Sequence, residues 1–203
     1  MPLKPLLILA STSRYRRELL ERLRLPFQVV SPEVDETPLP GEAPAALAIR
    51  LARAKAVAVA RQFPEAVVIG SDQVANLNGQ PLGKPGNHAR AALQLQQMQG
   101  QKVIFHTAVA VVCQQSGFAQ HLMADVEVRF RPLDAFEIEH YLHAEQPYDC
   151  AGSAKSEGLG IALLESIHSD DPTALIGLPL IRLCDLLRAA GVSLLQPQPA
   201  LFQ

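Results

Sequence analysis

Basic side chains gather directly behind a hydroxyl-rich turn near the start of the chain. Residues 6–10 are apolar and run into Ser11-Thr12-Ser13, which is followed by Arg14, Arg16 and Arg17. The N-terminus of a helix carries partial positive charge and favours acidic residues, so arginines there are unfavourable unless an anion binds among them. Backbone N–H groups, hydroxyls and guanidinium groups together suit a phosphate. We therefore expect phosphate binding at this turn, with a solvated basic turn as the alternative.

Carboxylates that could bind a metal or accept a proton occur at two other places. Asp72 follows the apolar run 66–70, and Glu33, Asp35 and Glu36 share one loop. In open α/β sheets ligands bind beyond the carboxyl ends of strands, where a carboxylate can hold a divalent metal or take a proton from water. A turn or cap role for Asp72 and a solvated acidic loop are the structural alternatives.

Two lysines stand at unusual positions. Lys55 interrupts an alanine-rich helical pattern, and Lys84 lies between Gly83 and Pro85 on a stiff turn. Each lysine taken alone is compatible with an ordinary surface position. A magnesium–triphosphate complex, however, needs carboxylates for the metal and cations for the phosphates. Together with the basic turn, these residues provide what a polyphosphate requires.

The elements that must position these side chains alternate between strand and helix. The pattern predicts an α/β fold with a mixed twisted sheet and flanking helices, as a single domain over residues 1–203 with two lobes around a central cleft. Asn78-Gly79 is typical of a tight hairpin, and Asp134 with Glu137 is typical of a helix-capping box. The expected strands are 6–10, 27–30, 66–70, 102–113 and 122–130; the expected helices are 14–24, 43–62, 89–98, 134–143 and 178–190.

Bulk composition excludes several classes of protein. The chain has 203 residues, 48% hydrophobic content and a net charge of −2, which disfavours a polynucleotide-binding protein. Its three cysteines offer no zinc-binding pair and suit core thiols in a reducing compartment. The N-terminal residues lack the pattern of a signal peptide, and no run reaches the roughly 18 apolar residues of a membrane span. We expect a cytoplasmic protein with no membrane association and a small anionic ligand.

Short motifs follow one another from about residue 5 to residue 190. Together they resemble the motifs of the Maf-type nucleotide pyrophosphatases, and it is their order along the chain that makes the resemblance specific. They are Ala10-Ser11-Thr12-Ser13 with Arg16-Arg17 and Leu19-Leu20, Val34-Asp35-Glu36, Leu51-Ala52-Arg53-Ala54-Lys55-Ala56, Ile69-Gly70-Ser71-Asp72-Gln73, Gly83-Lys84-Pro85, Ala151-Gly152-Ser153-Ala154-Lys155-Ser156-Glu157-Gly158 and Ile176-Gly177-Leu178-Pro179-Leu180.

The resemblance implies hydrolysis of a nucleoside triphosphate to a nucleoside monophosphate and pyrophosphate. It implies a divalent metal cofactor, Mg, Mn or Co. Asp72 matches the family's catalytic acidic residue, which accepts the proton of the attacking water or holds the metal, and Glu36 matches the carboxylate that assists with metal or water. Arg14 departs from the family, which usually has Pro there. The family's phosphate-contacting positions match Ser11, Arg16, Lys55 and Lys84.

Three further positions separate the subgroups of this family. Tyr15, Gln73 and Glu157 resemble the subgroup that acts on 7-methyl-GTP, which carries an aromatic residue, Gln and Glu there. Methylation at N7 makes guanine cationic, so its ring stacks well on an aromatic face. A carboxylate can accept hydrogen bonds from the guanine N1–H and amino groups. The subgroup's aromatic residue is typically Trp, and Tyr is a smaller platform.

Two other functions stay open at this point. One is the same reaction on dTTP, UTP or other modified nucleotides, and the other is a nucleotide-binding regulator of cell division that does not hydrolyse. His140 and His143 share a helix face without an evident third metal ligand, which favours an ordinary polar face. The C-terminal helix is expected to belong to the core, and part of it could form a homodimer interface.

Overall fold

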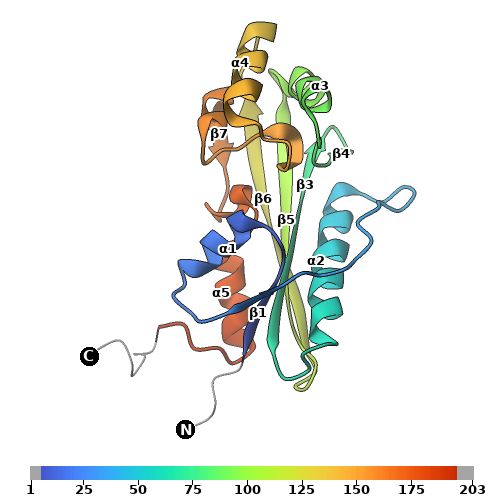
Figure 1. Ribbon diagram of the computed structural model, residues 1–203, viewed down its shortest axis with the longest axis vertical. Coiled ribbons are helices and arrows are strands. Elements are labelled where there is room, and N and C mark those ends of the chain that lie inside the picture. The colour runs from blue at the N-terminus through green and yellow to red at the C-terminus, as the bar shows by residue number, and fades with distance from the viewer. Residues whose placement is uncertain (1–5, 196–203) are drawn as a thin grey trace.

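A seven-stranded mixed sheet organises the molecule, in the order β2-β1-β3-β5-β6-β7, with β4 paired to β3 (Figure 1). The computed structural model describes residues 6–195. β1 pairs in parallel with β2 and β3, whereas the remaining pairs are antiparallel. The strands are β1 Leu7–Ala10, β2 Gln28–Val30, β3 Val67–Leu77, β4 Gln80–Leu82, β5 Lys102–Cys113, β6 Phe118–Phe130 and β7 Leu164–His168.

Five α-helices within residues 6–195 cover the sheet, and their apolar faces define three buried clusters. α2 packs on one face of β1, β3 and β5, and α1 and α5 pack on the opposite face (Figure 1). α3 and α4 lie at the far end of the long strands, over β5 and β6. The helices are α1 Arg14–Glu21, α2 Pro44–Ala60, α3 His88–Met98, α4 Ala135–Glu145 and α5 Leu180–Ala189.

Most predicted elements are present within a few residues of their expected ends. The predicted capping box on α4 is formed, with Asp134 and Glu137 bonding reciprocally. The turn between β3 and β4 has Asn78 at φ 51° and Gly79 at φ 86°, as a tight hairpin requires. The prediction of an α/β fold with a mixed sheet is confirmed, and the division into two lobes stays a prediction. No helix within residues 6–195 is long and apolar enough to cross a membrane.

The strand that carries Asp72 is longer than expected. The apolar pattern predicts that it ends at Gly70, but β3 continues to Leu77. The reason is its two neighbours: β1 stops pairing at Gly70, whereas β5 remains paired with β3 beyond it, with Asp72 opposite Ala108. Asp72 therefore lies within a strand, just past the carboxyl end of the neighbouring β1.

Candidate active site

A cavity of about 630 Å³ opens beyond the end of β1. Its walls come from the basic turn and α1, the loop after β2, α2, β3, the turn after β4 and the segments around residues 149–157 and 175–177. Of the candidates that the sequence offers, Arg17, Glu33 and Asp35 do not line it, whereas every site residue that the family resemblance implies does. These residues are Ser11, Tyr15, Arg16, Glu36, Lys55, Asp72, Gln73, Lys84 and Glu157.

Lys55 joins the two carboxylates predicted to do chemistry. Its Nζ atom lies 2.6 Å from Asp72 Oδ1 and 2.6 Å from Glu36 Oε1. The side chains of Lys55 and Asp72 are only 6% and 9% exposed, whereas that of Glu36 is 53% exposed. The Lys55 ammonium group thus binds both the buried carboxylate of Asp72 and the more accessible carboxylate of Glu36 at the wall of the cavity.

Strand alternation and one glycine explain why Lys55 reaches Asp72. Successive side chains of a strand point to opposite faces, so Gly70 and Asp72 both face α2. A Cβ atom on Gly70 would lie 2.2 Å from the Ala52 carbonyl oxygen and 2.6 Å from the Ala56 amide nitrogen, distances that no real side chain tolerates. Glycine therefore permits the close approach of α2 that places its lysine beside the strand.

The charge of Glu36 is set by its cationic neighbours. Burial alone would raise the pKa of Glu36, but the hydrogen bond and charge of Lys55 lower it, as do the charges of Lys84 and Arg16. The balance holds the pKa of Glu36 below its ordinary value. The carboxylate is therefore ionised at neutral pH, as metal binding or proton transfer from water requires.

A second ion pair anchors the loop that carries Glu36. Arg50 of α2 binds Glu42 through two bonds, Nε to Oε1 at 2.6 Å and Nη2 to Oε2 at 2.8 Å, and also donates to the Thr37 carbonyl at 3.0 Å. The hydrogen bond from Arg50 is the main cause that lowers the pKa of Glu42 to about 2. Sequence reasoning missed this pair because an eight-residue separation across a loop matches no periodic pattern.

Arg16 is held at the opposite wall of the cavity. Its Nε atom donates to the Gly177 carbonyl at 2.8 Å, and the guanidinium is partly buried. Burial lowers the pKa of Arg16, and the nearby charges of Asp72 and Glu36 oppose this shift. An arginine stays protonated under all working conditions, so a fixed positive charge faces the two carboxylates.

The hydroxyl-rich turn leads into a helix that begins at Arg14, as the sequence predicts. Ser13 caps α1 by accepting the Arg16 N–H at 3.4 Å, and the first turn of the helix holds no acidic residue. Buried Ser11 accepts the Ser13 N–H at 3.1 Å. The first N–H groups of any helix lack partners within it, so the start of α1 directs donors to the cavity that its residues line.

Gln73 lies on the opposite face of β3 from Asp72. Its Nε2 atom donates to the carbonyls of Ala174 and Leu175, each at 2.9 Å. This segment is held in turn by the fully buried Asp171, which accepts the N–H groups of Ile181 and Arg182 at the start of α5. Sequence reasoning missed Asp171 because it caps a helix that begins nine positions later, across an intervening turn.

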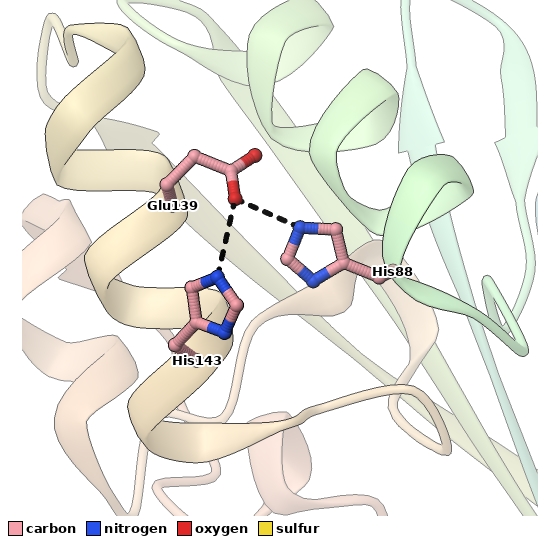
Figure 2. A group of neighbouring side chains, drawn as sticks. All are labelled: His88, Glu139 and His143. Atoms are coloured by element: carbon pink, nitrogen blue, oxygen red, sulfur yellow. Dashed lines mark hydrogen bonds and ion pairs between the residues drawn. The ribbon is translucent and has the colours of Figure 1, made fainter.

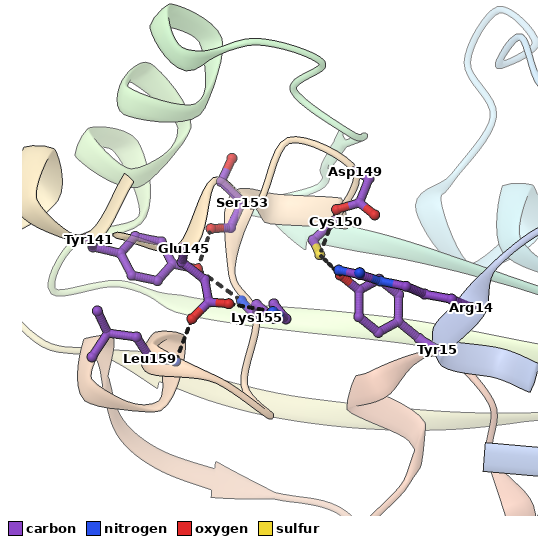
Figure 3. A network of polar contacts seen from close by, with 9 residues as sticks. All are labelled: Arg14, Tyr15, Tyr141, Glu145, Asp149, Cys150, Ser153, Lys155 and Leu159. Atoms are coloured by element: carbon purple, nitrogen blue, oxygen red, sulfur yellow. Dashed lines mark hydrogen bonds and ion pairs between the residues drawn. The ribbon is translucent and has the colours of Figure 1, made fainter. Parts of the chain in front are cut away.

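Tyr15 projects from α1 toward the segment around Cys150 (Figure 3). The Arg14 guanidinium lies 4.7 Å from the ring centroid and donates to the phenolic oxygen at 2.7 Å, while the Cys150 sulfur lies 4.0 Å from that oxygen. Burial raises the pKa of Cys150 to about 12, so its thiol is neutral. Arg14, which the sequence placed only among the cations of the basic turn, thus covers one face of the Tyr15 ring.

The segment that carries Glu157 is tied to α4 (Figure 3). Glu145 pairs with Lys155 and accepts the Leu159 N–H at 2.8 Å. The Tyr141 hydroxyl donates to the Ser153 carbonyl at 3.1 Å and accepts the Lys155 N–H at 3.0 Å. The ion-pair partner of Lys155 is therefore Glu145.

The donor set at the cavity suits a hard divalent cation. Asp72 and Glu36 each bind Lys55 through one oxygen, which leaves the second oxygen of each carboxylate for another cation. Mg²⁺ and Mn²⁺ prefer carboxylate oxygens, and Mg²⁺ is commonly bound by one or two carboxylates together with substrate phosphates. Asp72 and Glu36 therefore have the donor chemistry that a divalent metal would require.

The fold and the cavity together define an α/β protein with a polyphosphate-compatible site. A solved structure of a HAM1 protein from Coxiella burnetii shares the fold, with a TM-score of 0.51 and 16% identity over 91% of this chain and 99% of that one. The family model described as Maf-like protein matches residues 6–190, and the chain belongs to this family.

Relatives of high identity extend over nearly the whole chain. A protein of Polaromonas sp. strain JS666 is 72% identical over 93% of this chain and 86% of its own length. One from Albidiferax ferrireducens is 67% identical over 96% of this chain and 98% of its own, and one from Thiobacillus denitrificans is 58% identical over 94% and 95%. All three are named 7-methyl-GTP pyrophosphatase. The predicted family resemblance and the hydrolase class are confirmed.

Proposed function

We propose that this protein hydrolyses 7-methyl-GTP to 7-methyl-GMP and pyrophosphate, and so removes a modified nucleotide from the cell's pool. The observation that carries the proposal is the single cavity lined by both carboxylates, by the phosphate-binding cations and by Tyr15 with Glu157. The relatives named for this activity support the choice of substrate.

The triphosphate is expected to bind between α1 and the lysines. Arg16, Lys55 and Lys84 line the cavity as cations, and the N–H groups at the start of α1 add further donors. Preorganised donors and cations stabilise the charge that develops on a transferred phosphoryl group and its leaving group. In this arrangement the cations neutralise the departing pyrophosphate.

Asp72 is the proposed base for the attacking water. As the water oxygen bonds to the α-phosphorus, the bond to the β-phosphate oxygen breaks, and Asp72 takes the water proton. Lys55, 2.6 Å away, holds the carboxylate in place during this transfer. A bound Mg, Mn or Co ion would be held by Glu36, with Asp72 as its second ligand in the alternative role of that residue, and would supply charge neutralisation and polarisation of the phosphoryl oxygens.

The nucleobase of the substrate is expected to lie between Tyr15 and Glu157. Arg14 covers one face of the Tyr15 ring, so the cationic 7-methylguanine stacks on the other face or replaces the guanidinium. Glu157 accepts hydrogen bonds from the N1–H and amino groups, and Gln73 braces the wall formed by residues 174–175. Lys155 forms its ion pair with Glu145.

A substrate panel tests this proposal. Pyrophosphate release is measured from 7-methyl-GTP, GTP, dTTP and UTP with Mg, Mn or Co. We expect 7-methyl-GTP to be preferred, and Glu157→Gln to reduce that preference, while Glu165→Gln, at an exposed acidic residue outside the cavity, preserves it. A preference for UTP or dTTP would overturn the assignment of the nucleobase. Tight nucleotide binding without hydrolysis, in the presence of each of the three metals, would instead favour a regulator.

A cytoplasmic location and a homodimer formed partly by α5 belong to the same proposal. The dimer is tested by the mass of the purified protein in size-exclusion chromatography with light scattering. A monomeric mass at assay concentrations would remove it from the proposal without affecting the assigned reaction.

A further inference from the structure

Two histidines and a glutamate meet outside the cavity, on facing helices (Figure 2). His88 is the first residue of α3, and Glu139 and His143 lie one turn apart on α4. Glu139 Oε2 lies 2.9 Å from His88 Nε2 and 3.7 Å from His143 Nε2. The sequence paired His143 with His140 and offered no third ligand, whereas the structure places His88 and Glu139 beside His143 as side chains that can act as ligands.

The spacing of these atoms suits a small divalent ion. The three ligand atoms lie within 4.8 Å of one another. Ligands bound tetrahedrally to zinc at 2.0–2.1 Å are about 3.3 Å apart. The distances from Glu139 Oε2 to the two histidine Nε2 atoms, 2.9 Å and 3.7 Å, lie on either side of that value. The imidazole rings, with centroids 5.2 Å apart, face the same carboxylate without stacking on each other. Binding a metal requires only small side-chain adjustments.

His88 is oriented by groups outside the cluster. Its Nδ1 atom lies 3.1 Å from the Tyr148 hydroxyl, and Asn87 caps α3 by accepting the Arg90 N–H at 3.0 Å. Metal-binding histidines commonly use their other ring nitrogen in a hydrogen bond that fixes the ring and its tautomer. With Nδ1 engaged by Tyr148, Nε2 is the nitrogen available to a metal.

We propose that His88, Glu139 and His143 form a second metal site, for Zn²⁺ or a similar transition metal ion. Two imidazoles and one carboxylate select such ions over Mg²⁺, which prefers oxygen ligands alone. Water completes the coordination, because the side chains of His88, Glu139 and His143 are 36%, 49% and 77% exposed. None of the three lines the cavity of the proposed active site.

A metal there would link two parts of the cavity wall. Lys84 precedes His88 by four residues, and the Gly86 N–H donates to the Tyr148 carbonyl at 3.0 Å. Tyr148 leads directly into Asp149 and Cys150, which line the cavity. An ion that joins α3 to α4 therefore restrains the two chain segments that the Gly86–Tyr148 hydrogen bond connects, one with Lys84 and one with Asp149 and Cys150. It also stabilises the folded protein by mass action.

Calorimetric titration with Zn²⁺ tests the site, with His143→Ala and Glu139→Gln as the disrupting variants. His140→Ala is the matched control, because His140 is also exposed on α4 but is outside the cluster. Removing one of the three ligands should weaken Zn²⁺ binding by about tenfold or more. The control should bind Zn²⁺ as the original protein does. Tyr148→Phe should cause a smaller loss.

Thermal unfolding gives a second readout. Zn²⁺ should raise the melting temperature of the original protein and of His140→Ala, and should raise that of His143→Ala and Glu139→Gln less. Without Zn²⁺, His143→Ala should melt with the control, since its side chain is 77% exposed. Equal Zn²⁺ affinity and equal melting shifts in the original protein, His143→Ala and Glu139→Gln would overturn the proposal.

Discussion

Lys55 Nζ donates to Asp72 Oδ1 over 2.6 Å, and both side chains are almost completely buried. The two residues come from α2 and β3, and Glu36 adds a second carboxylate to the same lysine nitrogen. Breaking a buried ion pair by removing one partner leaves an uncompensated charge, which costs far more than losing an exposed pair. The pair therefore couples the stability of the protein to the proposed chemistry.

Substituting each partner of this pair should have a different result. Asp72→Asn removes the proposed base but leaves Lys55 paired with Glu36, so we expect activity to fall by about 10²–10⁴ while the fold persists. Lys55→Met leaves Asp72 without its cation, so we expect stability to fall by about 3–5 kcal/mol. Pyrophosphate release and urea unfolding measure the two effects. Full activity in Asp72→Asn would contradict the catalytic assignment.

Gly70→Ala should separate α2 from β3. The added Cβ would lie 2.2 Å from the Ala52 carbonyl oxygen, and overpacking of this kind costs about 1–3 kcal/mol or more. Activity should fall as well, because the displaced helix carries Lys55. Gly83→Ala is the control for stability, since its Cβ would meet no atom within 4 Å. Urea unfolding that gives the same midpoint for both variants would show that the helix adjusts freely.

Acid should weaken the anchor of the Glu36 loop. The pKa of Glu42 is lowered from 4.5 to about 2 in the folded protein, mainly by Arg50. A lowered pKa contributes stability above the unfolded value, and this contribution is lost as pH falls through the folded value. Glu42→Gln should therefore be less stable than the original protein at neutral pH, and the difference should vanish between pH 4.5 and 2. Thermal unfolding across that range measures it.

Glu145→Gln should loosen the segment that carries Glu157. Its carboxylate binds Lys155 and the Leu159 N–H, and small misplacements of binding groups can reduce rates by up to about 10²-fold. We expect kcat/KM for 7-methyl-GTP to fall, with the loss mainly in KM. Glu127→Gln breaks the exposed Lys102 pair and should change little. Equal kinetics in the two variants would mean that the segment holds its position without Glu145.

Several features of the site could be predicted because their signals are local. The start of a helix at Arg14, the capping box at Asp134 and the hairpin at Asn78-Gly79 depend on residues close in sequence, and all are present. The end of β3 was predicted wrongly, because the length of a strand depends on its neighbours. β5 remains paired beyond Gly70, where β1 has ended.

The contacts between distant segments could not be predicted. Arg50 with Glu42, Tyr141 and Glu145 with the 153–159 segment, and His88 with α4 join residues whose separations match no helical or strand period. Their side chains are ordinary polar surface types, so each is ambiguous until the backbone is placed. These contacts position the proposed catalytic and base-binding residues and form the proposed second metal site.

The sequence by itself determined which reactive side chains the protein has and which face of each strand or helix they occupy. Only the tertiary structure decided that Lys55 meets both Asp72 and Glu36, because that meeting depends on how closely α2 approaches β3. The approach is possible where Gly70 has no Cβ, and the steric fit of two backbones far apart in the chain is a property of the packed fold.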